Sequence, residues 1–312
     1  MIIIAVIIFL IALAALIFAS KWVIDSSIAI SEYTGISQLA IGFILIAFSV
    51  SIPDFMVSVM ATSMQKAPMA IGDVLGSSIA NICLVLGVVT LLRKVRVERL
   101  HTLESAELLL LISIVPAVIL SKGVVGPIEG IILLIVFCLY CFFIFRDKFS
   151  LNIRDGVTKK EWRRAIVLFL LGMIIVIGSS YFVVGSAAEI ATFFGVSEAV
   201  IGLTLISFGT TLPELALDFT AIRKGQCALA IGDILGSTVI NLTLILGTVL
   251  VMSPIGGMAL MSYTIPLAFI IIANTFLFYS MVKHEGIGHK QGMVFILLYI
   301  IFIITMLTTR MV

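Results

Sequence analysis

Two acidic residues, Asp54 and Glu214, lie inside long apolar stretches of this chain, and each directly follows a proline. The first stretch reads AFSVSIPDFMVSVMAT from Ala47, and the second reads SFGTTLPELALDFTAI from Ser207. An acid in such a stretch is costly unless it pairs with a base or binds a cation. Neither stretch contains Lys or Arg. We therefore interpret both acids as cation ligands rather than as members of structural ion pairs.

Polar side chains accompany each acid at helical spacing. Intervals of three and four place them on one helix face, as Ser51, Asp54, Ser58 and Thr62 in the first stretch and Ser207, Thr211, Glu214 and Asp218 in the second. The apolar stretches that follow, GDVLGSSIANICLVLG and GDILGSTVINLTLILG, repeat Asp, Ser and Asn every four residues. Their members are Asp73, Ser77 and Asn81, and Asp233, Ser237 and Asn241. Each stretch is expected to turn one polar stripe toward an interior.

Backbone oxygens add to the predicted ligands. Proline lacks an N–H and clashes with the preceding turn, so we expect a break or kink just before Pro53 and Pro213 that frees nearby carbonyls. The predicted site comprises Asp54, Glu214, Asn81, Asn241, Ser77, Ser237, Ser51, Thr210, Thr211, Ala47, Val50 and Ser207. Every ligand atom is oxygen, which suits hard cations such as Ca²⁺ and not Zn²⁺ or Cu⁺.

Three further acids form a second rank of candidates. Asp73 and Asp233 follow a glycine, where a carboxylate caps a helix start or, alternatively, contacts the ion. Asp218 is placed nearer the cytoplasm, and we interpret it as a vestibule residue.

The acids belong to an internal repeat. Residues 41–87 and 201–247 align without a gap at an offset of 160, and they share Gly, Pro, Asp, Ser and Asn at matched positions. Random pairing of apolar helices would match Leu and Ile but not this set, so the repeat is genuine. The offset also pairs Ser20 with Ser180, which extends the repeat to the first helix of each half.

Composition identifies the chain as an integral membrane protein. Of its 312 residues, 62% are hydrophobic and 12% are charged. Apolar runs long enough to cross a bilayer predict ten helices, at 2–23, 36–62, 69–92, 104–121, 125–145, 164–185, 196–222, 229–251, 259–281 and 291–308. The fold class is therefore an all-α membrane protein. The first run lacks the features of a cleaved signal peptide and is interpreted as a retained helix.

The basic residues predict the topology. Loops on one side of the predicted helices carry 16 of the 19 Lys and Arg residues, and such loops remain in the cytoplasm. Both termini are then outside. Five helices per half is an odd number, so the second half is inserted upside down. We expect a first inverted repeat at 1–145, a cytoplasmic connector at 146–163 and a second inverted repeat at 164–312.

The motifs GTTLPEL at 209–215 and GDILGSTVINLTLILG at 232–247, with their repeat partners, resemble the two α-repeats of the Ca²⁺:cation antiporter superfamily, particularly the microbial sodium/calcium exchangers. The resemblance covers essentially all ten predicted helices. It implies a mid-membrane site shared by Na⁺ and Ca²⁺ on the second, third, seventh and eighth helices, with the first and sixth sliding across them. This chain differs from the family pattern at Val50, Asp54 and Asn241, and at Asp73 and Asp233.

These observations predict an antiporter that exchanges Ca²⁺ for Na⁺ across the cell membrane by alternating access, and not an enzyme. Inverted repeats are typical of such secondary transporters. A Ca²⁺/H⁺ exchanger is the alternative, because protonation could also empty two close carboxylates; a passive cation channel and a non-transporting scaffold are further alternatives. We expect no cofactor, and inorganic cations and the lipid bilayer as partners. We expect neither a nucleic-acid partner nor an obligatory protein partner.

Overall fold

The structure is a computed structural model that describes residues 2–34, 41–63, 65, 67–96, 99–122, 124–148, 158–193, 207–256, 263–284 and 286–308. The first half contains α1 (Ile2–Thr34), the π-helix η1 (Gly42–Ala47), α3 (Phe48–Ser63), α4 (Ala67–Ile79), the π-helix η2 (Ala80–Val85), α5 (Leu86–Leu92), β1 (Val95–Arg96), α6 (Arg99–Leu120), β2 (Val124–Val125) and α7 (Pro127–Lys148). The second half contains α8 (Lys159–Phe193), α10 (Ser207–Arg223), α11 (Cys227–Val239), the π-helix η4 (Ile240–Ile245), α12 (Leu246–Met252), β3 (Ile255–Gly256), α14 (Thr264–His284), β4 (Gly286–Ile287) and α15 (His289–Thr308).

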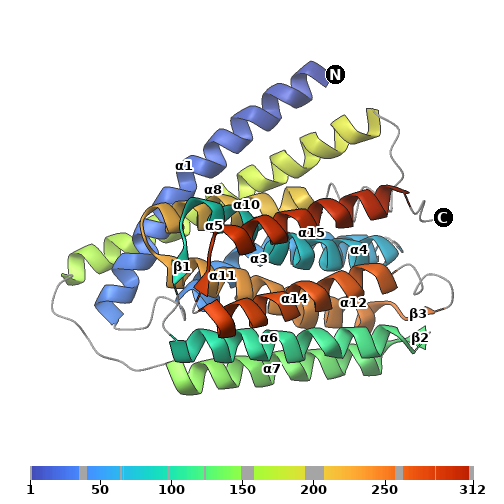
Figure 1. The fold of residues 1–312 in the computed structure, drawn as a ribbon. Helices are drawn as coiled ribbons and strands as arrows, with labels where there is room; N and C mark the ends of the chain where they lie inside the picture. Colours follow the sequence, from blue (N-terminus) through green and yellow to red (C-terminus); the bar gives the residue numbers. More distant parts are fainter. Residues whose placement is uncertain are drawn as a thin grey trace.

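The two halves follow the same structural plan. The run α4–η2–α5 and the run α11–η4–α12 have identical internal boundaries at the offset of 160, including the π-helical turn. Four strands of two residues each modify the all-α prediction, and they pair between the halves: β1 with β4, and β2 with β3, both antiparallel. The β1 end and the β2–β3 end lie at opposite ends of the helices (Figure 1). Each half therefore completes a ribbon of the other.

Two close helix crossings also join the halves. A Cβ built on Gly130 of α7 would lie 2.5 Å from the carbonyl oxygen of Gly247 in α12. A Cβ on Gly87 of α5 would lie 3.2 Å from the carbonyl oxygen of Gly292 in α15. Small residues let helix backbones approach this closely in membranes. The α7–α12 and α5–α15 contacts therefore depend on glycine at the crossing.

A glycine of α11 lies at a contact with the other half. A Cβ on Gly236 would meet Phe43 and Ala47 of η1, the latter at 2.8 Å. A Cβ on Gly42 would in turn meet the backbone of α11 at Leu229 and Gly232. These glycines therefore pack η1 of the first half against α11 of the second.

Five helical spans of the described residues are long and apolar enough to cross a membrane: Leu45–Ser63, Ala70–Leu92, Cys227–Met252, Thr264–His284 and His289–Thr308. Ala106–Leu120 and Pro127–Phe143 are shorter apolar helices. The predicted first and sixth runs are parts of longer helices, because α1 continues to Thr34 and α8 to Phe193. Parts of the predicted runs at 36–62, 196–222 and 259–281 lie outside the described residues.

The second proline does not break its helix, because α10 continues as an α-helix through Pro213. In the first half, α3 is likewise continuous from Phe48 to Ser63. The irregular hydrogen bonding lies earlier, in the π-helical η1, which ends at Ala47. Tertiary packing thus accommodates a proline within a helix, as membrane helices often allow.

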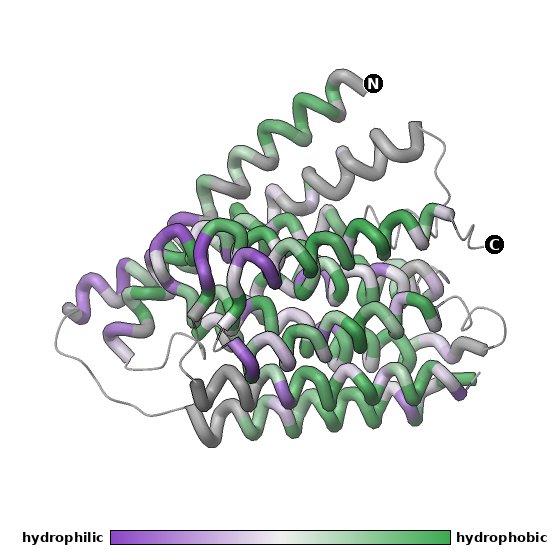
Figure 2. The backbone as a smooth tube through the Cα atoms, viewed as in Figure 1, coloured by the Kyte–Doolittle hydropathy of each residue, from purple (hydrophilic) through white to green (hydrophobic). Residues whose placement is uncertain are grey.

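One end of the molecule is more polar than the other. Hydrophilic residues gather most strongly near β1, the α10–α11 turn and the start of α8, whereas the start of α1 and the end of α15 both lie at the opposite end (Figure 2). At the start of α8, the backbone N–H of Thr158 donates to Glu161 at 2.8 Å, and the N–H of Glu161 donates to Thr158 Oγ1 at 3.3 Å. This reciprocal cap satisfies free amides of the first turn. The hydrogen bonds from Thr158 hold the pKa of Glu161 below its usual value.

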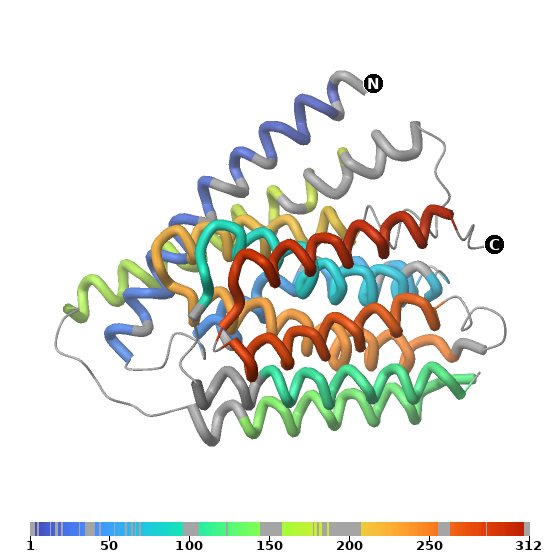
Figure 3. Tube along the Cα trace, in the orientation of Figure 1, coloured from blue at the N-terminus to red at the C-terminus, as the bar shows by residue number. Residues whose placement is uncertain are grey.

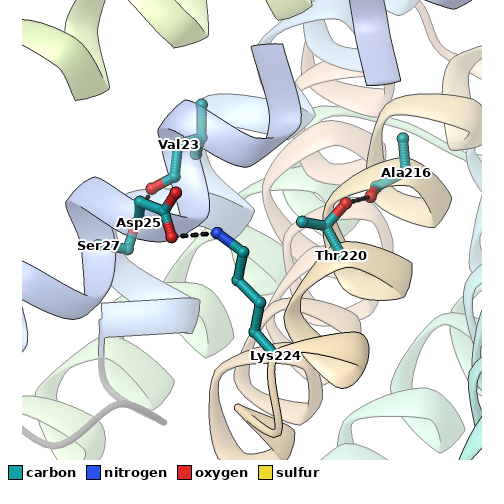
Figure 4. A network of polar contacts seen from close by, with 6 residues as sticks. All are labelled: Val23, Asp25, Ser27, Ala216, Thr220 and Lys224. Atoms are coloured by element: carbon teal, nitrogen blue, oxygen red, sulfur yellow. Dashed lines mark hydrogen bonds and ion pairs between the residues drawn. The ribbon is translucent and has the colours of Figure 1, made fainter. Parts of the chain in front are cut away.

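The pair of long helices α1 and α8 pack on each other and cross the remaining helices obliquely (Figure 1). At the polar end, Lys224 of the α10–α11 turn forms an ion pair with Asp25 of α1 (Figure 4). The same turn contains Gly225 with a φ of 80°, and its counterpart at the offset of 160 is Gln65 with a φ of 64°. The turn thus requires a left-handed residue in both halves, and only the second half supplies glycine.

Candidate functional site

The two acids that the sequence singles out lie at the centre of the molecule. Asp54 of α3 and Glu214 of α10 are each 1% exposed. The segments that carry the predicted ligands come from both halves and interleave, blue to cyan from the first and yellow to orange from the second (Figure 3). In particular, α3 packs against η4, and α10 packs against α4 and η2. Each acid therefore faces ligands that the opposite half supplies.

Hydroxyl groups link the two halves directly. Ser77 Oγ of α4 lies 3.3 Å from Thr210 Oγ1 of α10, within hydrogen-bonding distance. Thr210 and Thr211 also donate to the carbonyl oxygen of Ser207, at 3.2 and 2.6 Å. The predicted Ser207 carbonyl is therefore engaged by two threonine hydroxyls. An ion would have to share this oxygen with them or displace them.

The two predicted carboxamides occupy matched irregular turns. Asn81 is the second residue of η2, and Asn241 is the second residue of η4; both side chains are fully buried. A π-helical turn widens the helix and redirects its side chains, and such turns are frequent at functional sites. No sequence pattern considered above predicts them. The two turns recur at the offset of 160, so both halves carry this irregularity.

The unusual property of the site is its unsatisfied oxygens. Buried side-chain atoms without a hydrogen-bond partner include both carboxylate oxygens of Asp54, Asp73 and Glu214, both polar atoms of Asn81 and Asn241, and Ser51 Oγ and Ser58 Oγ. Buried polar atoms are normally paired, so a cluster of unpaired ones indicates an unfilled role. Among the side chains whose burial the structure describes, no Lys or Arg is buried. Among these described side chains, the charge of the acids therefore has no counterion.

The acids are also close enough to influence one another. Asp54 faces the side chains of Thr210 and Asn241, although no bond of normal hydrogen-bond geometry joins them. The charge of Asp54 acts on both Asp73 and Glu214. Asp54 and Glu214 thus share one electrostatic environment, as a common cation would require.

The second-rank candidates are more central than the sequence suggests. Asp73 and Asp233 lie well inside α4 and α11 rather than at their starts, so the capping interpretation is wrong. Asp218 is 1% exposed, which also excludes an open vestibule. It faces Asp233 and interacts with the charges of Asp233 and Glu214. All three acids therefore belong to the same buried cluster as Asp54 and Glu214.

Several predicted site residues are buried but carry no charged side chain. Ala47 and Val50 are fully buried, Ala47 lies against Gly236, and Ser51 is 2% exposed with an unpartnered hydroxyl. Ser237 donates a long hydrogen bond of 3.4 Å to Asp233. Val50 is the counterpart of Thr210 at the offset of 160, so the hydroxyl contact that Thr210 makes with Ser77 has no equivalent in the other half.

The sequence interpretation missed three polar side chains. Ser58 is fully buried and faces Asp73, and its place on the predicted polar stripe was the available signal. Asn274 and Ser280 of α14 are 1% and 0% exposed and lack hydrogen-bond partners. The helix that carries them packs against α4 and η2. The sequence signal for Asn274 was its position as a lone Asn in the apolar run IIIANTFLF.

The donor set suits a hard cation held by mixed oxygen ligands. Within the parts of the chain that the structure describes, no three His, Cys, Asp or Glu side chains converge closely enough to hold a metal by themselves. Ca²⁺ takes six to eight oxygens. A cation between Asp54 and Glu214 must therefore draw most of its ligands from the hydroxyl, amide and carbonyl oxygens around them.

Comparisons with known proteins agree on one family. The family described as sodium/calcium exchanger protein matches residues 4–146 and 164–308. An uncharacterized membrane protein of Methanocaldococcus jannaschii is 30% identical over 298 residues, which cover 94% of this chain and 95% of that protein. The sodium/calcium exchanger MaX1 of Methanosarcina acetivorans is 28% identical over 96% of this chain and 98% of its own length. The solved structure of the sodium-calcium exchanger NCX_Mj, soaked with 10 mM Na⁺ and zero Ca²⁺, superposes with a TM-score of 0.86 at 28% identity, covering 99% of this chain and 100% of that one.

Proposed function

This chain belongs to the sodium/calcium exchanger family, and from that premise we propose that it exchanges Ca²⁺ for Na⁺ at the buried acids Asp54 and Glu214. The protein is a multi-pass membrane antiporter of inorganic cations and not an enzyme. MaX1 and NCX_Mj are named as sodium/calcium exchangers. That likeness supports Na⁺ as the counter-ion here.

The observation that carries the proposal is the group of buried oxygens from both halves that surrounds the acids. Within the described part of the chain, these oxygens have no hydrogen-bond partner and no basic side chain is buried beside the acids. Removing two carboxylates from water without compensation is strongly unfavourable. One Ca²⁺ or two Na⁺ would neutralise Asp54 and Glu214 equally well. The site therefore binds either Ca²⁺ or Na⁺, and the protein resists the change between its inward-facing and outward-facing states when the site is empty. Coupled exchange requires this resistance.

We assign the ligands by extension from these acids. Asp54 and Glu214 bind both ions, and the hydroxyls of Ser51, Ser77, Thr210, Thr211 and Ser237, the amides of Asn81 and Asn241, and the carbonyls of Ala47, Val50 and Ser207 complete the shells. The proposed frame consists of ten membrane spans in two inverted repeats, 1–145 and 164–312, joined by a cytoplasmic connector at 146–163. The termini lie outside the cell. Pairing of strands between halves at opposite ends of the helices supports this inverted arrangement.

Exchange of Ca²⁺ for H⁺ is the second candidate, and the observation that favours it is the presence of further buried acids beside the central pair. The decisive experiment uses purified protein in liposomes and measures ⁴⁵Ca²⁺ uptake driven by an outward Na⁺ gradient or by a pH gradient. We expect uptake with the Na⁺ gradient, retained when the pH gradient is collapsed by an ionophore. Uptake driven only by the pH gradient would favour the second candidate, and uptake without any counter-ion would indicate a passive channel.

A further inference from the structure

Asp218 and Asp233 form a second acidic pair within the buried cluster that contains Asp54 and Glu214. Asp218 lies one helical turn beyond Glu214 on α10, and its carboxyl group faces that of Asp233 on α11. Asp218 is 1% exposed and Asp233 is fully buried. Two carboxylates therefore meet side by side, away from solvent.

The pair is only partly satisfied by its surroundings. Asp233 Oδ1 accepts a 3.4 Å hydrogen bond from Ser237 Oγ. Asp218 Oδ2 and Asp233 Oδ2 are buried without any partner. These unpartnered oxygens are an observation independent of the acidic character of the pair, and they indicate a missing positively charged group.

A count of charges shows that the central site cannot supply that group. Five carboxylates are buried among the described residues: Asp54, Asp73, Glu214, Asp218 and Asp233. No Lys or Arg is buried among the residues of described exposure. A single Ca²⁺ between Asp54 and Glu214 balances only two negative charges. Asp218 and Asp233 would then still repel each other in a medium of low polarity.

The first half shows what the same place looks like without the extra acid. The offset of 160 places Ser58 where Asp218 stands, and Ser58 faces Asp73 as Asp218 faces Asp233. The fold therefore tolerates a serine in this position. The acid at this position, Asp218, is present in the second half alone. Because the fold does not require it, Asp218 should have a role specific to the second half.

We propose that Asp218 and Asp233, together with the Ser237 hydroxyl that they share with the exchange site, form a second cation site, which holds one Na⁺ beside Asp54 and Glu214. The inference rests on the proposed function for the identity of the ion, because Na⁺ is the proposed counter-ion. Carboxylate and hydroxyl oxygens are ligands for hard cations. Two carboxylates and one hydroxyl are too few for Ca²⁺, which takes six to eight oxygens. A singly charged ion also relieves the repulsion between the two acids.

Equilibrium binding of ²²Na⁺ to the purified full-length protein, without Ca²⁺, tests the proposal. Asp218→Ser transfers the residue of the first half, and Asp218→Asn keeps the shape of the side chain. We expect each variant to bind one Na⁺ fewer per chain than the wild type, whereas the affinity for ⁴⁵Ca²⁺ in the absence of Na⁺ stays within about tenfold of the wild type. The control Thr220→Ala, on the same helix with its hydroxyl bonded to the Ala216 carbonyl (Figure 4), should leave both unchanged.

Unchanged Na⁺ stoichiometry in the two Asp218 variants would overturn the inference and would indicate that the pair holds a shared proton instead. A parallel loss of Ca²⁺ affinity of about tenfold or more would also overturn it, because Asp218 would then belong to the exchange site. If Asp218→Ser fails to fold, Asp218→Asn alone decides. The binding measurement is independent of the transport measurement. If the wild type shows no Na⁺-driven ⁴⁵Ca²⁺ uptake but the Asp218 variants still bind one Na⁺ fewer, the proposed function is refuted and the second cation site is retained.

Discussion

Asp54 and Glu214 show how far single residues determine the behaviour of this protein. Both are buried, neither has a hydrogen-bond partner for its carboxylate oxygens among the described residues, and they lie on helices of opposite halves. The sequence identified them because acids are rare in apolar stretches. It could not place Asp73, Asp218 and Asp233 in the same cluster, since a Gly-Asp pair is also typical of a helix start. Only the packing of α4 and α11 resolves that ambiguity.

Removal of either central charge should abolish transport without unfolding the protein. In Glu214→Gln and Asp54→Asn, the amide fills the same space but cannot balance a cation, so we expect ⁴⁵Ca²⁺ uptake in liposomes to fall at least about a hundredfold. Because a buried unpaired charge is also removed, thermal stability in detergent without Ca²⁺ and Na⁺ should be unchanged or higher. The exposed Glu161→Gln is the control and should transport normally. Full activity in both site variants would disprove the assignment.

At the scale of elements, the repeat predicts which helices match between the halves but does not predict which helices pack against each other. The offset of 160 predicted that α4–η2–α5 and α11–η4–α12 would match, because the two segments share glycine, aspartate, serine and asparagine at matched positions. The sequence did not predict that Gly236 packs against η1, because a small residue permits close approach to a helix without determining which helix that is. The π-helical turns and the continuity of α10 through Pro213 also depend on tertiary packing.

The α3–α4 turn offers a stabilising substitution. Gln65 has a φ of 64°, whereas its counterpart Gly225 has a φ of 80° in the equivalent turn. A side chain in the left-handed region costs about 1–2 kcal/mol, part of which glycine loses again through unfolded-state entropy. We expect Gln65→Gly to raise the unfolding free energy by roughly 0.5–1 kcal/mol, seen as a higher melting temperature in detergent. The reverse change, Gly225→Gln, should lower it; equal stability of all three proteins would contradict the strain.

The α7–α12 crossing should tolerate no side chain. Gly130→Ala places a methyl group 2.5 Å from the Gly247 carbonyl oxygen, so the helices must separate. Overpacking of this kind typically costs about 1–3 kcal/mol. We expect a clear loss of thermal stability and of monodisperse protein in detergent. Gly178→Ala is the matched control, because its Cβ would meet nothing within 4 Å, and alanine should stabilise α8 there by up to about 1 kcal/mol. Equal behaviour of the two variants would show that the crossing is loose.

At the scale of the whole molecule, the ion pair between Asp25 and Lys224 connects α1 of the first half to the α10–α11 turn of the second. Its side chains are 61% and 32% exposed, so solvent weakens it. A double-mutant cycle with Asp25→Lys and Lys224→Asp should give a coupling of at most about 1 kcal/mol, with the double reversal partly restoring stability. High salt should reduce the coupling. A cycle between Asp25 and Lys283 should give none; equal coupling in the two cycles would show that the effect is general charge rather than this contact.

The strand ribbons and glycine crossings have a consequence for biosynthesis. Until α12, β3, β4 and α15 have been synthesised, the first half has no partner for either of its strands and no neighbour for Gly87 or Gly130. While the second half is translated, the first half is therefore an intermediate in the bilayer that lacks its strand pairing and its glycine contacts. An ancestral gene that encoded one half could have met the same need only if two copies of its product docked on each other.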